Sequence, residues 1–297
     1  MQQSQQQQLP YRNIISDDHP IYKPEANRYH LYIVNSCPFA HRAYIALKLK
    51  GLEGIIGLSI TEPVFDDELG WQFSESYPDH VNGFSSIPDL YKKSGNPEYT
   101  GRFTVPLLWD KQSSTIVNNE SPDLLRILNN SFNQFVNSET SPIDLYPSDL
   151  QLEINELNGK IAEHINSGVY KVGAAKTQEI YNTNVDNLFK TFNELEERLE
   201  KSGSKYLFGD RLTETDIRLF TTLIRFDIVY YHVMKCNLKQ IQQYTYLKKY
   251  LVNLYQIPTF RSTVDFNEIK TGDYKAKVFN PSGIIPIGPN IDYLLQL

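Results

Sequence analysis

Apolar positions change their spacing part-way along the chain, from short runs in the first half to a helical repeat in the second. Residues 29–34, 54–60 (GIIGLSI) and 115–118 (TIVN) are short apolar runs rich in β-branched residues. Such runs predict buried strands. After the first run, Pro38 and the apolar positions beyond it predict a helix that ends at Gly51. Strand, helix and strand with short links predict a parallel β-α-β unit.

A long segment without periodicity interrupts this pattern. Residues 61–100 are rich in Gly, Pro, Ser and Asp and contain Trp71. Loops of this length tend to be functional or disordered. Residues 101–110 (GRFTVPLLWD) then predict a strand, in which Pro106 requires an edge, a bulge or a special turn because proline lacks a ladder donor. The bond between Val105 and this proline is therefore a candidate cis bond.

Apolar residues in the second half recur at intervals of three and four, as on one face of a helix. At the end of the first half, Ser121, followed by proline, predicts a short helix with this serine as its N-cap. Longer helices are predicted at residues 150–165 and 185–199, the second ending at Gly203. Within residues 207–227, the sequence TETD resembles a capping box before a helix that is apolar nearly all round. That helix is expected at the buried centre of a bundle.

These patterns divide the chain into four parts. We expect a Gln-rich disordered lead and arm at residues 1–24 and an α/β domain at residues 25–132. A linker at residues 133–149 then leads to a helical domain with an irregular C-terminal tail at residues 150–297.

Composition narrows the class of protein. The 297 residues carry a net charge of −6, which argues against a nucleic-acid partner. No stretch approaches the roughly 20 apolar residues of a membrane span, and the N-terminus lacks the features of a secretory signal. Two cysteines suit a reducing, cytoplasmic compartment, and with six scattered histidines they show no zinc spacing. No metal, flavin or nicotinamide motif is present.

Cys37 is the candidate nucleophile. It lies at the predicted strand-to-helix turn, where backbone N–H groups and the helix dipole favour an anion, so its thiol should ionise more readily than a free thiol. The alternative is a buried structural cysteine. Position 40 is alanine, so no second thiol stands beside it, and an external thiol such as glutathione must reset the site. Cys236, expected within a helix, is interpreted as inert and buried.

Several segments resemble the glutathionyl-hydroquinone reductases, the xi-class glutathione transferases related to the omega class. CPFAHR (37–42) resembles the family's CPWAHR, with Phe39 where tryptophan is usual. IKTGDY (269–274) stands where an IKxHYY-like segment is expected, so the segment 271–277 diverges. Five further segments also resemble the family: RFTVPLLWD (102–110), TIVNNES (115–121), GVYKVG (168–173), TETDIRLFTTLIRFD (213–227) and NPSGIIPIGP (280–289).

The resemblance implies a glutathione transferase fold, with a thioredoxin-like α/β N-terminal domain and an all-α C-terminal domain. It also implies that glutathione is the co-substrate, that small-molecule glutathione conjugates are the partners, and that the protein is a homodimer. The implied reaction is reduction of S-glutathionyl-hydroquinones through a mixed disulfide between Cys37 and glutathione. The implied phenol-recognising residues are Tyr170 and Tyr274, with Tyr231 as a weaker candidate; in a chain with 20 tyrosines, each has packing as its alternative role.

The same resemblance assigns glutathione contacts, each of which has a structural alternative. Glu120 is assigned to the γ-glutamyl amine and Ser121 to its carboxylate, although Ser121 is also a good N-cap. Trp71 is placed over glutathione or anchors its loop, and Arg102 either meets the glycyl carboxylate or faces solvent. Val105, before Pro106, offers its backbone to the cysteinyl part of glutathione or simply forms a turn.

Two other functions remain open from the sequence. An omega-like transferase with thiol transferase or dehydroascorbate reductase activity would use the same Cys37 chemistry without a dedicated quinone pocket. A non-catalytic binding module with the transferase fold would not need a reactive thiol.

Overall fold

The computed structural model describes residues 11–95, 101–136 and 143–295. The chain forms two compact units, residues 1–141 and 142–297. The Gln-rich lead up to residue 10 and residues 137–142 of the predicted linker lie outside the described residues. None of the helices in the described ranges is long and apolar enough to cross a membrane.

The first unit is built on a mixed sheet. Its described strands are β1 (Tyr29–Ile33), β2 (Gly57–Ile60), β3 (Leu107–Asp110) and β4 (Thr115–Asn118), in the order β2-β1-β3-β4. β1 and β2 run parallel, whereas β3 is antiparallel to both β1 and β4. β1 is buried along its whole length, as its continuous apolar run predicts.

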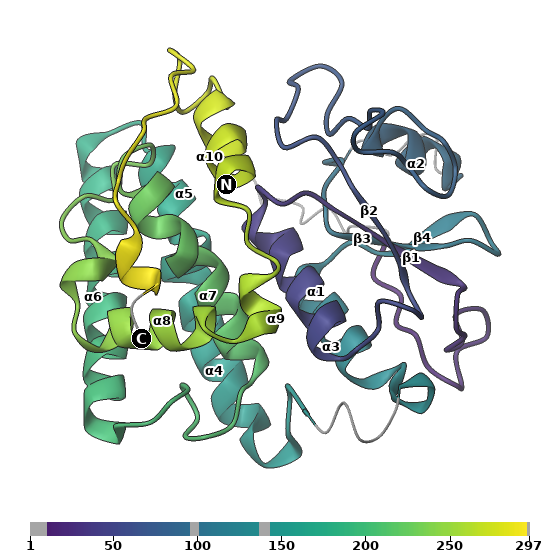
Figure 1. Cartoon of the computed structure of the whole chain (residues 1–297), viewed down its shortest axis with the longest axis horizontal. Coiled ribbons are helices and arrows are strands. Elements are labelled where there is room, and N and C mark those ends of the chain that lie inside the picture. The colour runs from purple at the N-terminus through teal and green to yellow at the C-terminus, as the bar shows by residue number, and fades with distance from the viewer. Residues whose placement is uncertain (1–10, 96–100, 137–142, 296–297) are drawn as a thin grey trace, which may run out of the picture. The chain divides into compact units, whose positions relative to one another are not determined.

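In the described part of this unit, three α-helices accompany the sheet. α1 (Pro38–Leu49) and α3 (Ser121–Asn130) pack against each other, and α2 (Ile87–Lys93) packs beside β4 (Figure 1). The strand–helix–strand start, followed by an antiparallel hairpin and a final helix, confirms the predicted α/β fold of the first half.

The structure corrects several local predictions in this unit. The second and third strands are shorter than predicted, because residues 54–56 form a turn and β3 begins only after Pro106. The segment 61–100 is not all loop, since α2 forms within it. Ser121 is the first helical residue of α3 and not its N-cap, which is Glu120.

The second unit is helical, in agreement with the predicted class. Its α-helices are α4 (Gln151–Ile161), α5 (Gly168–Gly173), α6 (Gln178–Ser202), α7 (Glu214–Arg225), α8 (Tyr246–Tyr255), α9 (Pro258–Arg261) and α10 (Phe266–Lys275). Gly203 ends α6 in a left-handed conformation (φ 61°), as predicted from its position. The predicted helix 150–165 is interrupted, because α4 passes into a π-helical turn at Ala162–Asn166.

α7 is the buried centre of the second unit. All of its residues are buried, and the predicted capping box between Thr213 and Asp216 is present. The Asp216 carboxylate accepts hydrogen bonds from the backbone N–H of Thr213 (2.8 Å) and of Leu207 (3.0 Å), and from the Tyr250 hydroxyl (2.9 Å). Burial raises the pKa of Asp216, while these donors act in the opposite direction. This carboxylate therefore ties the start of α7 to α8 and to the turn after α6.

Candidate functional site

Cys37 lies at the start of α1, as predicted. It is the N-cap residue, and its side chain makes no capping hydrogen bond. Its backbone carbonyl accepts from the N–H of His41 (3.0 Å), and its own N–H donates to Val34 (3.2 Å), so the turn from β1 into α1 is fixed by the backbone. The side chain is partly exposed. A partly exposed thiol at a helix N-terminus has the setting of a reactive cysteine.

The segment before β3 comes next to this thiol. The Val105–Pro106 peptide bond is cis, and both residues are buried. The Sγ atom of Cys37 lies 3.8 Å from the backbone oxygen of Val105. Residues 68 positions apart in the sequence therefore meet at one end of the sheet, because β1 and β3 are neighbours.

The start of α3 forms the other part of the site. Arg42, buried on α1, donates from Nη1 to the Oγ atom of Ser121 (3.2 Å), and its Cζ atom lies 4.7 Å from the centre of the Phe39 ring. An arginine in the first turn of a helix can be a plain polar residue or a charge that helps to hold a nearby thiolate. The structure also gives Arg42 a contact with the predicted glutathione-binding serine.

Glu120 directly precedes this serine and is half-buried. Burial raises the pKa of its carboxyl group; Arg12 lowers it in turn, and Asp123 raises it. The backbone N–H of Glu120 donates to the Oδ1 atom of Asn118 (2.8 Å). The pair at 120 and 121 thus offers a carboxylate and a hydroxyl side by side, which match the amine and carboxylate of an amino acid.

The structure places Trp71 and Arg102 in the first unit, on segments that flank this site in sequence. Trp71 is partly exposed and packs edge-on against Phe65, with ring centres 5.0 Å apart. Its backbone oxygen accepts from the N–H of Ile87, the first residue of α2 (2.9 Å). Arg102 is exposed, three residues before Val105.

The predicted phenol-recognising tyrosines belong to the second unit. The hydroxyl of Tyr170, on α5, lies 3.1 Å from that of Tyr230, and the rings are packed edge-on. Tyr274, on α10, is buried and donates to the backbone oxygen of Ile228 (3.0 Å). Burial, with a smaller contribution from Asp273, raises the pKa of Tyr274 to about 12.

Tyr230 was missed in the sequence, where Tyr231 was the weaker third candidate. Tyr230 is buried in a π-helical turn (Phe226–Tyr230), whereas Tyr231 is partly exposed and packs against His232. Two consecutive tyrosines give no sign of which one faces inward, because a π-helical turn shifts the helical spacing.

Cys236 is buried, as predicted, but it does not lie within a helix. Burial raises the pKa of its thiol well above the usual range. A buried thiol of this kind stays protonated at neutral pH and is a poor nucleophile.

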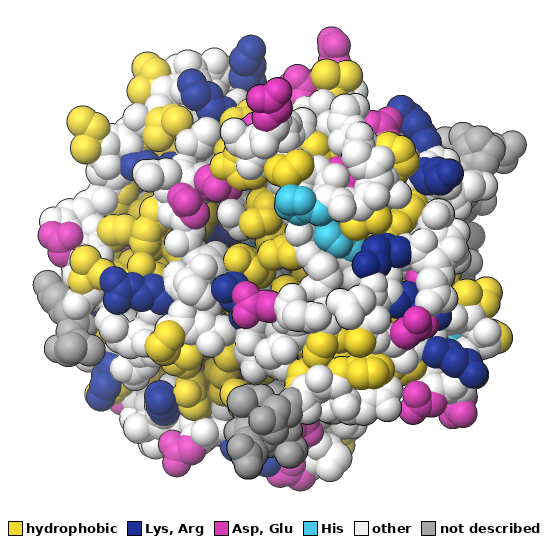
Figure 2. Space-filling model, turned by 45° about the vertical axis from the view of Figure 1, so that its right-hand side comes forward, with side chains coloured by type: hydrophobic (Ala, Val, Ile, Leu, Met, Phe, Trp, Pro, Cys, Tyr) yellow, Lys and Arg dark blue, Asp and Glu magenta, His cyan; other side chains and the backbone are white. Residues whose placement is uncertain are grey.

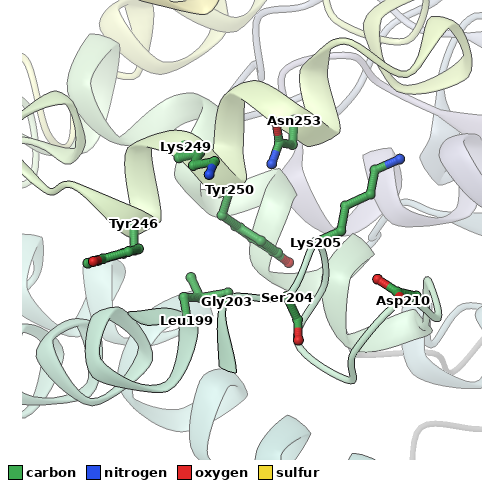
Figure 3. Close-up of a pocket in the computed structure, with 9 residues that line it drawn as sticks. All are labelled: Leu199, Gly203, Ser204, Lys205, Asp210, Tyr246, Lys249, Tyr250 and Asn253. Atoms are coloured by element: carbon green, nitrogen blue, oxygen red, sulfur yellow. The ribbon is translucent and has the colours of Figure 1, made fainter. Parts of the chain in front are cut away.

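A cavity in the second unit lies apart from these residues in the chain. It has a volume of about 290 Å³ and is bounded by the end of α6, the turn after it and α8 (Figure 3). None of its nine lining residues is among the predicted site residues.

Across residues 11–95, 101–136 and 143–295, no three His, Cys, Asp or Glu side chains are grouped to hold a metal ion. On the face drawn in Figure 2, Lys and Arg side chains are scattered among Asp and Glu.

Comparison with known proteins identifies the fold family. Residues 36–131 match the glutathione S-transferase N-terminal domain, and residues 178–252 match its C-terminal domain. The chain is 43% identical over 270 residues to the glutathionyl-hydroquinone reductase YqjG of Escherichia coli, covering 89% of this chain and 80% of that protein. The chain belongs to the glutathionyl-hydroquinone reductase family of xi-class glutathione transferases.

Other members of this family are similar over nearly the whole chain. The omega-like glutathione S-transferase 2 of Schizosaccharomyces pombe is 41% identical over 292 residues, covering 95% of this chain and 93% of that protein. The crystal structure of the xi glutathione transferase ECM4 from Saccharomyces cerevisiae, in complex with glutathione, superposes with a TM-score of 0.91 at 37% identity. It covers 95% of this chain and 96% of that one. The predicted family and fold are thus confirmed.

Proposed function

We propose that this xi-class transferase reduces S-glutathionyl-hydroquinones, with glutathione as the reductant. The observation that carries the proposal is the position of Cys37, partly exposed at the start of α1 and 3.8 Å from the carbonyl before the cis proline. Relatives named glutathionyl-hydroquinone reductase, at 41% and 43% identity, support the choice of substrate.

In the proposed first step, the Cys37 thiolate attacks the glutathione sulfur of the conjugate. The sulfur–carbon bond breaks, its electron pair stays with the aromatic ring, and a proton is taken up there. A mixed disulfide between Cys37 and glutathione remains, and hydroquinone leaves. A second glutathione then attacks the mixed disulfide as its thiolate, which gives oxidised glutathione and the free Cys37 thiolate. This second step needs an external thiol, because Cys236 is buried and its thiol stays protonated.

The residues around Cys37 fit glutathione as the bound thiol. We assign the γ-glutamyl amine to Glu120 and its carboxylate to Ser121, whose hydroxyl also accepts a hydrogen bond from the buried cation Arg42. The backbone of Val105, before Pro106, takes the cysteinyl part of glutathione as a strand would. Trp71 is proposed to cover glutathione and Arg102 to meet its glycyl carboxylate.

Tyr170 and Tyr274 are proposed to recognise the phenolic oxygens of the hydroquinone. The Tyr170 hydroxyl lies 3.1 Å from that of Tyr230, and the Tyr274 hydroxyl donates to the carbonyl of Ile228. To stabilise charge that develops on a phenolic oxygen, Tyr274 has to turn its proton from this carbonyl to the substrate. Gly272 and Asp273 lie in the divergent segment 271–277, directly before Tyr274. We therefore expect the range of accepted quinones to differ from that of relatives.

An omega-like thiol transferase is the second candidate, favoured by relatives named omega-like in two yeasts. The double variant Tyr170→Phe, Tyr274→Phe separates the two. Under the reductase proposal, turnover of a glutathionyl-hydroquinone falls about a hundredfold, the scale of losing positioned donors, while reduction of a simple mixed disulfide stays near wild type. Tyr244→Phe is the control, since Tyr244 is also a buried, hydrogen-bonded tyrosine of the second unit. Equal loss of both reactions would contradict a dedicated phenol site.

The remaining proposals concern the cell and the assembly. We propose a homodimer in the cytoplasm, which the resemblance and the two free cysteines support. A non-catalytic binding module is the third candidate, and it would leave Cys37 unreactive. Alkylation of Cys37 by iodoacetamide at pH 7, faster than that of free cysteine, would exclude such a module.

A further inference from the structure

The arm before the first strand runs beside the proposed γ-glutamyl site. Residues 11–13 pair antiparallel with the end of β4: the N–H of Asn13 donates to Val117 (3.0 Å), and the N–H of Asn119 donates to Tyr11 (3.1 Å). The second bond lies beyond the last residue of β4. The arm therefore also holds the backbone that leads into Glu120.

Side chains continue this attachment into α3. Arg12 binds both carboxylate oxygens of Asp123, with Nε and Nη2 each 2.8 Å away. The Asn118 amide donates to the backbone oxygen of Asn13 (3.1 Å) and to Asp123 Oδ2 (3.3 Å), while its Oδ1 accepts from the N–H of Glu120 (2.8 Å). A continuous set of hydrogen bonds thus runs from the arm to Glu120.

The arm also packs against Tyr91, which is hydrogen-bonded to the segment before Val105. Tyr11 is buried and packs edge-on against Tyr91, with ring centres 5.6 Å apart. The Tyr91 hydroxyl donates to the backbone oxygen of Thr104 (3.0 Å) and accepts from the Asn119 amide (2.9 Å). Tyr91 therefore joins the segment before Pro106 to the one before Glu120, and the arm packs on this junction.

We propose that Arg12 is a positioning residue of the glutathione site, acting through Asp123 and Asn118 on the backbone that carries Glu120 and Ser121. The inference rests on the proposed function, because it assumes that glutathione binds at these two residues. Arg12 has a second effect through charge. Burial raises the pKa of the Glu120 carboxyl group. The charge of Arg12 lowers this pKa, whereas the charge of Asp123 raises it. These two charges come from the arm and from α3.

Arg12→Gln in the full chain tests the proposal, with turnover of a glutathionyl-hydroquinone as the assay. We expect the KM for the glutathionyl-hydroquinone, whose glutathionyl group fills this site, to rise about fivefold, the scale of coupling within one hydrogen-bond network, with kcat nearly unchanged. The melting temperature should change little, because exposed ion pairs contribute little to stability. Arg211→Gln is the matched control. Arg211 binds both oxygens of Asp149 (2.8 and 3.0 Å) with similar exposure, 50% against 58% for Arg12, but in the second unit.

A pH profile separates positioning by Arg12 from a merely structural role. Glutathione binding is expected to weaken as pH falls and Glu120 takes up a proton. In Arg12→Gln, nothing opposes the effect of burial on the pKa of Glu120, so the acidic limb of the pH profile moves to higher pH. Asp123→Asn removes the neighbouring anion, so its acidic limb lies at lower pH than that of Arg12→Gln. A merely structural ion pair would raise KM equally in both variants without moving the limb, which would overturn the proposal.

Glu120→Gln separates failure of the proposed role of Arg12 from failure of the proposed glutathione site. If Glu120→Gln raises the KM for the glutathionyl-hydroquinone while Arg12→Gln leaves this KM and the acidic limb at wild-type values, the role of Arg12 is wrong and the site stands. If Glu120→Gln has no effect either, glutathione does not bind at this residue, and both the site and the role of Arg12 are wrong.

Discussion

Two helix starts, one in each unit, are built in opposite ways. α7 begins with a capping box, and the Asp216 carboxylate there accepts bonds from two backbone N–H groups and from Tyr250. α1 begins at Cys37, whose side chain makes no capping hydrogen bond. The first start is buried inside its unit, whereas the second presents a partly exposed thiol.

The same contrast holds for a second pair. α6 is capped by Thr177, whose hydroxyl accepts from the N–H of Ile180 (3.2 Å). α3 begins at Glu120 and Ser121 without a side-chain cap, and the hydroxyl of Ser121 faces Arg42 instead. A helix start satisfied by its own side chains stabilises the fold, whereas one that leaves its N–H groups to another partner suits an anion. In these two pairs, the capped starts of α6 and α7 are structural, and the uncapped starts of α1 and α3 are the candidate functional ones.

The largest expected effect is on chemistry at the start of α1. Cys37→Ser should lower turnover of a glutathionyl-hydroquinone by more than about a thousandfold, as losing a nucleophile does, while the melting temperature stays close to wild type. Stopped-flow or steady-state detection of hydroquinone release measures the loss. Cys236→Ser is the control, because its thiol is buried and protonated; full activity in Cys37→Ser would refute the contrast outright.

The next effect is on stability, at the start of α7. Asp216→Asn keeps the shape of the side chain but turns an amide group toward donors, so we expect it to lower the free energy of unfolding by about 3 kcal/mol. Denaturant titration followed by circular dichroism measures this loss. Folded molecules of the variant should keep a reactive Cys37. A variant as stable as wild type would mean that the buried carboxylate is not a structural cap.

The smallest effects come from the second pair of helix starts and should differ in kind. Thr177→Ala should cost about 1 kcal/mol of stability, the usual value of a lost N-cap, without changing the KM for the glutathionyl-hydroquinone. Ser121→Ala should raise that KM about tenfold with little loss of stability, because its hydroxyl caps no N–H and the lost contact is a polar one to ligand. If the contrast is wrong, Thr177→Ala raises the KM and Ser121→Ala lowers the stability.

Part of this architecture was predictable from local pattern. The range of the last strand and the glycine that ends α6 were predicted correctly, because short β-branched runs and helix stop signals act over a few residues. The capping box at α7 was visible for the same reason. α2 was missed because it is short, begins with a proline in its first turn and lies in a segment without apolar periodicity.

What the sequence could not predict depends on contacts between distant residues. The contact between Arg42 and Ser121 was not predicted, because the two residues are 79 positions apart and meet only when α1 packs on α3. The attachment of Arg12 to Asp123, over 111 positions, was missed for the same reason. Tyr230 was overlooked because a π-helical turn changes which of two adjacent tyrosines faces inward.

The central claim is that Cys37 itself takes the glutathionyl group from the conjugate. The most direct measurement is mass spectrometry of the protein mixed with one equivalent of a glutathionyl-hydroquinone and no free glutathione. We predict release of hydroquinone together with one glutathionyl group on Cys37, which added glutathione then removes as oxidised glutathione. Hydroquinone release without this adduct, or with the adduct on Cys236, would contradict the account.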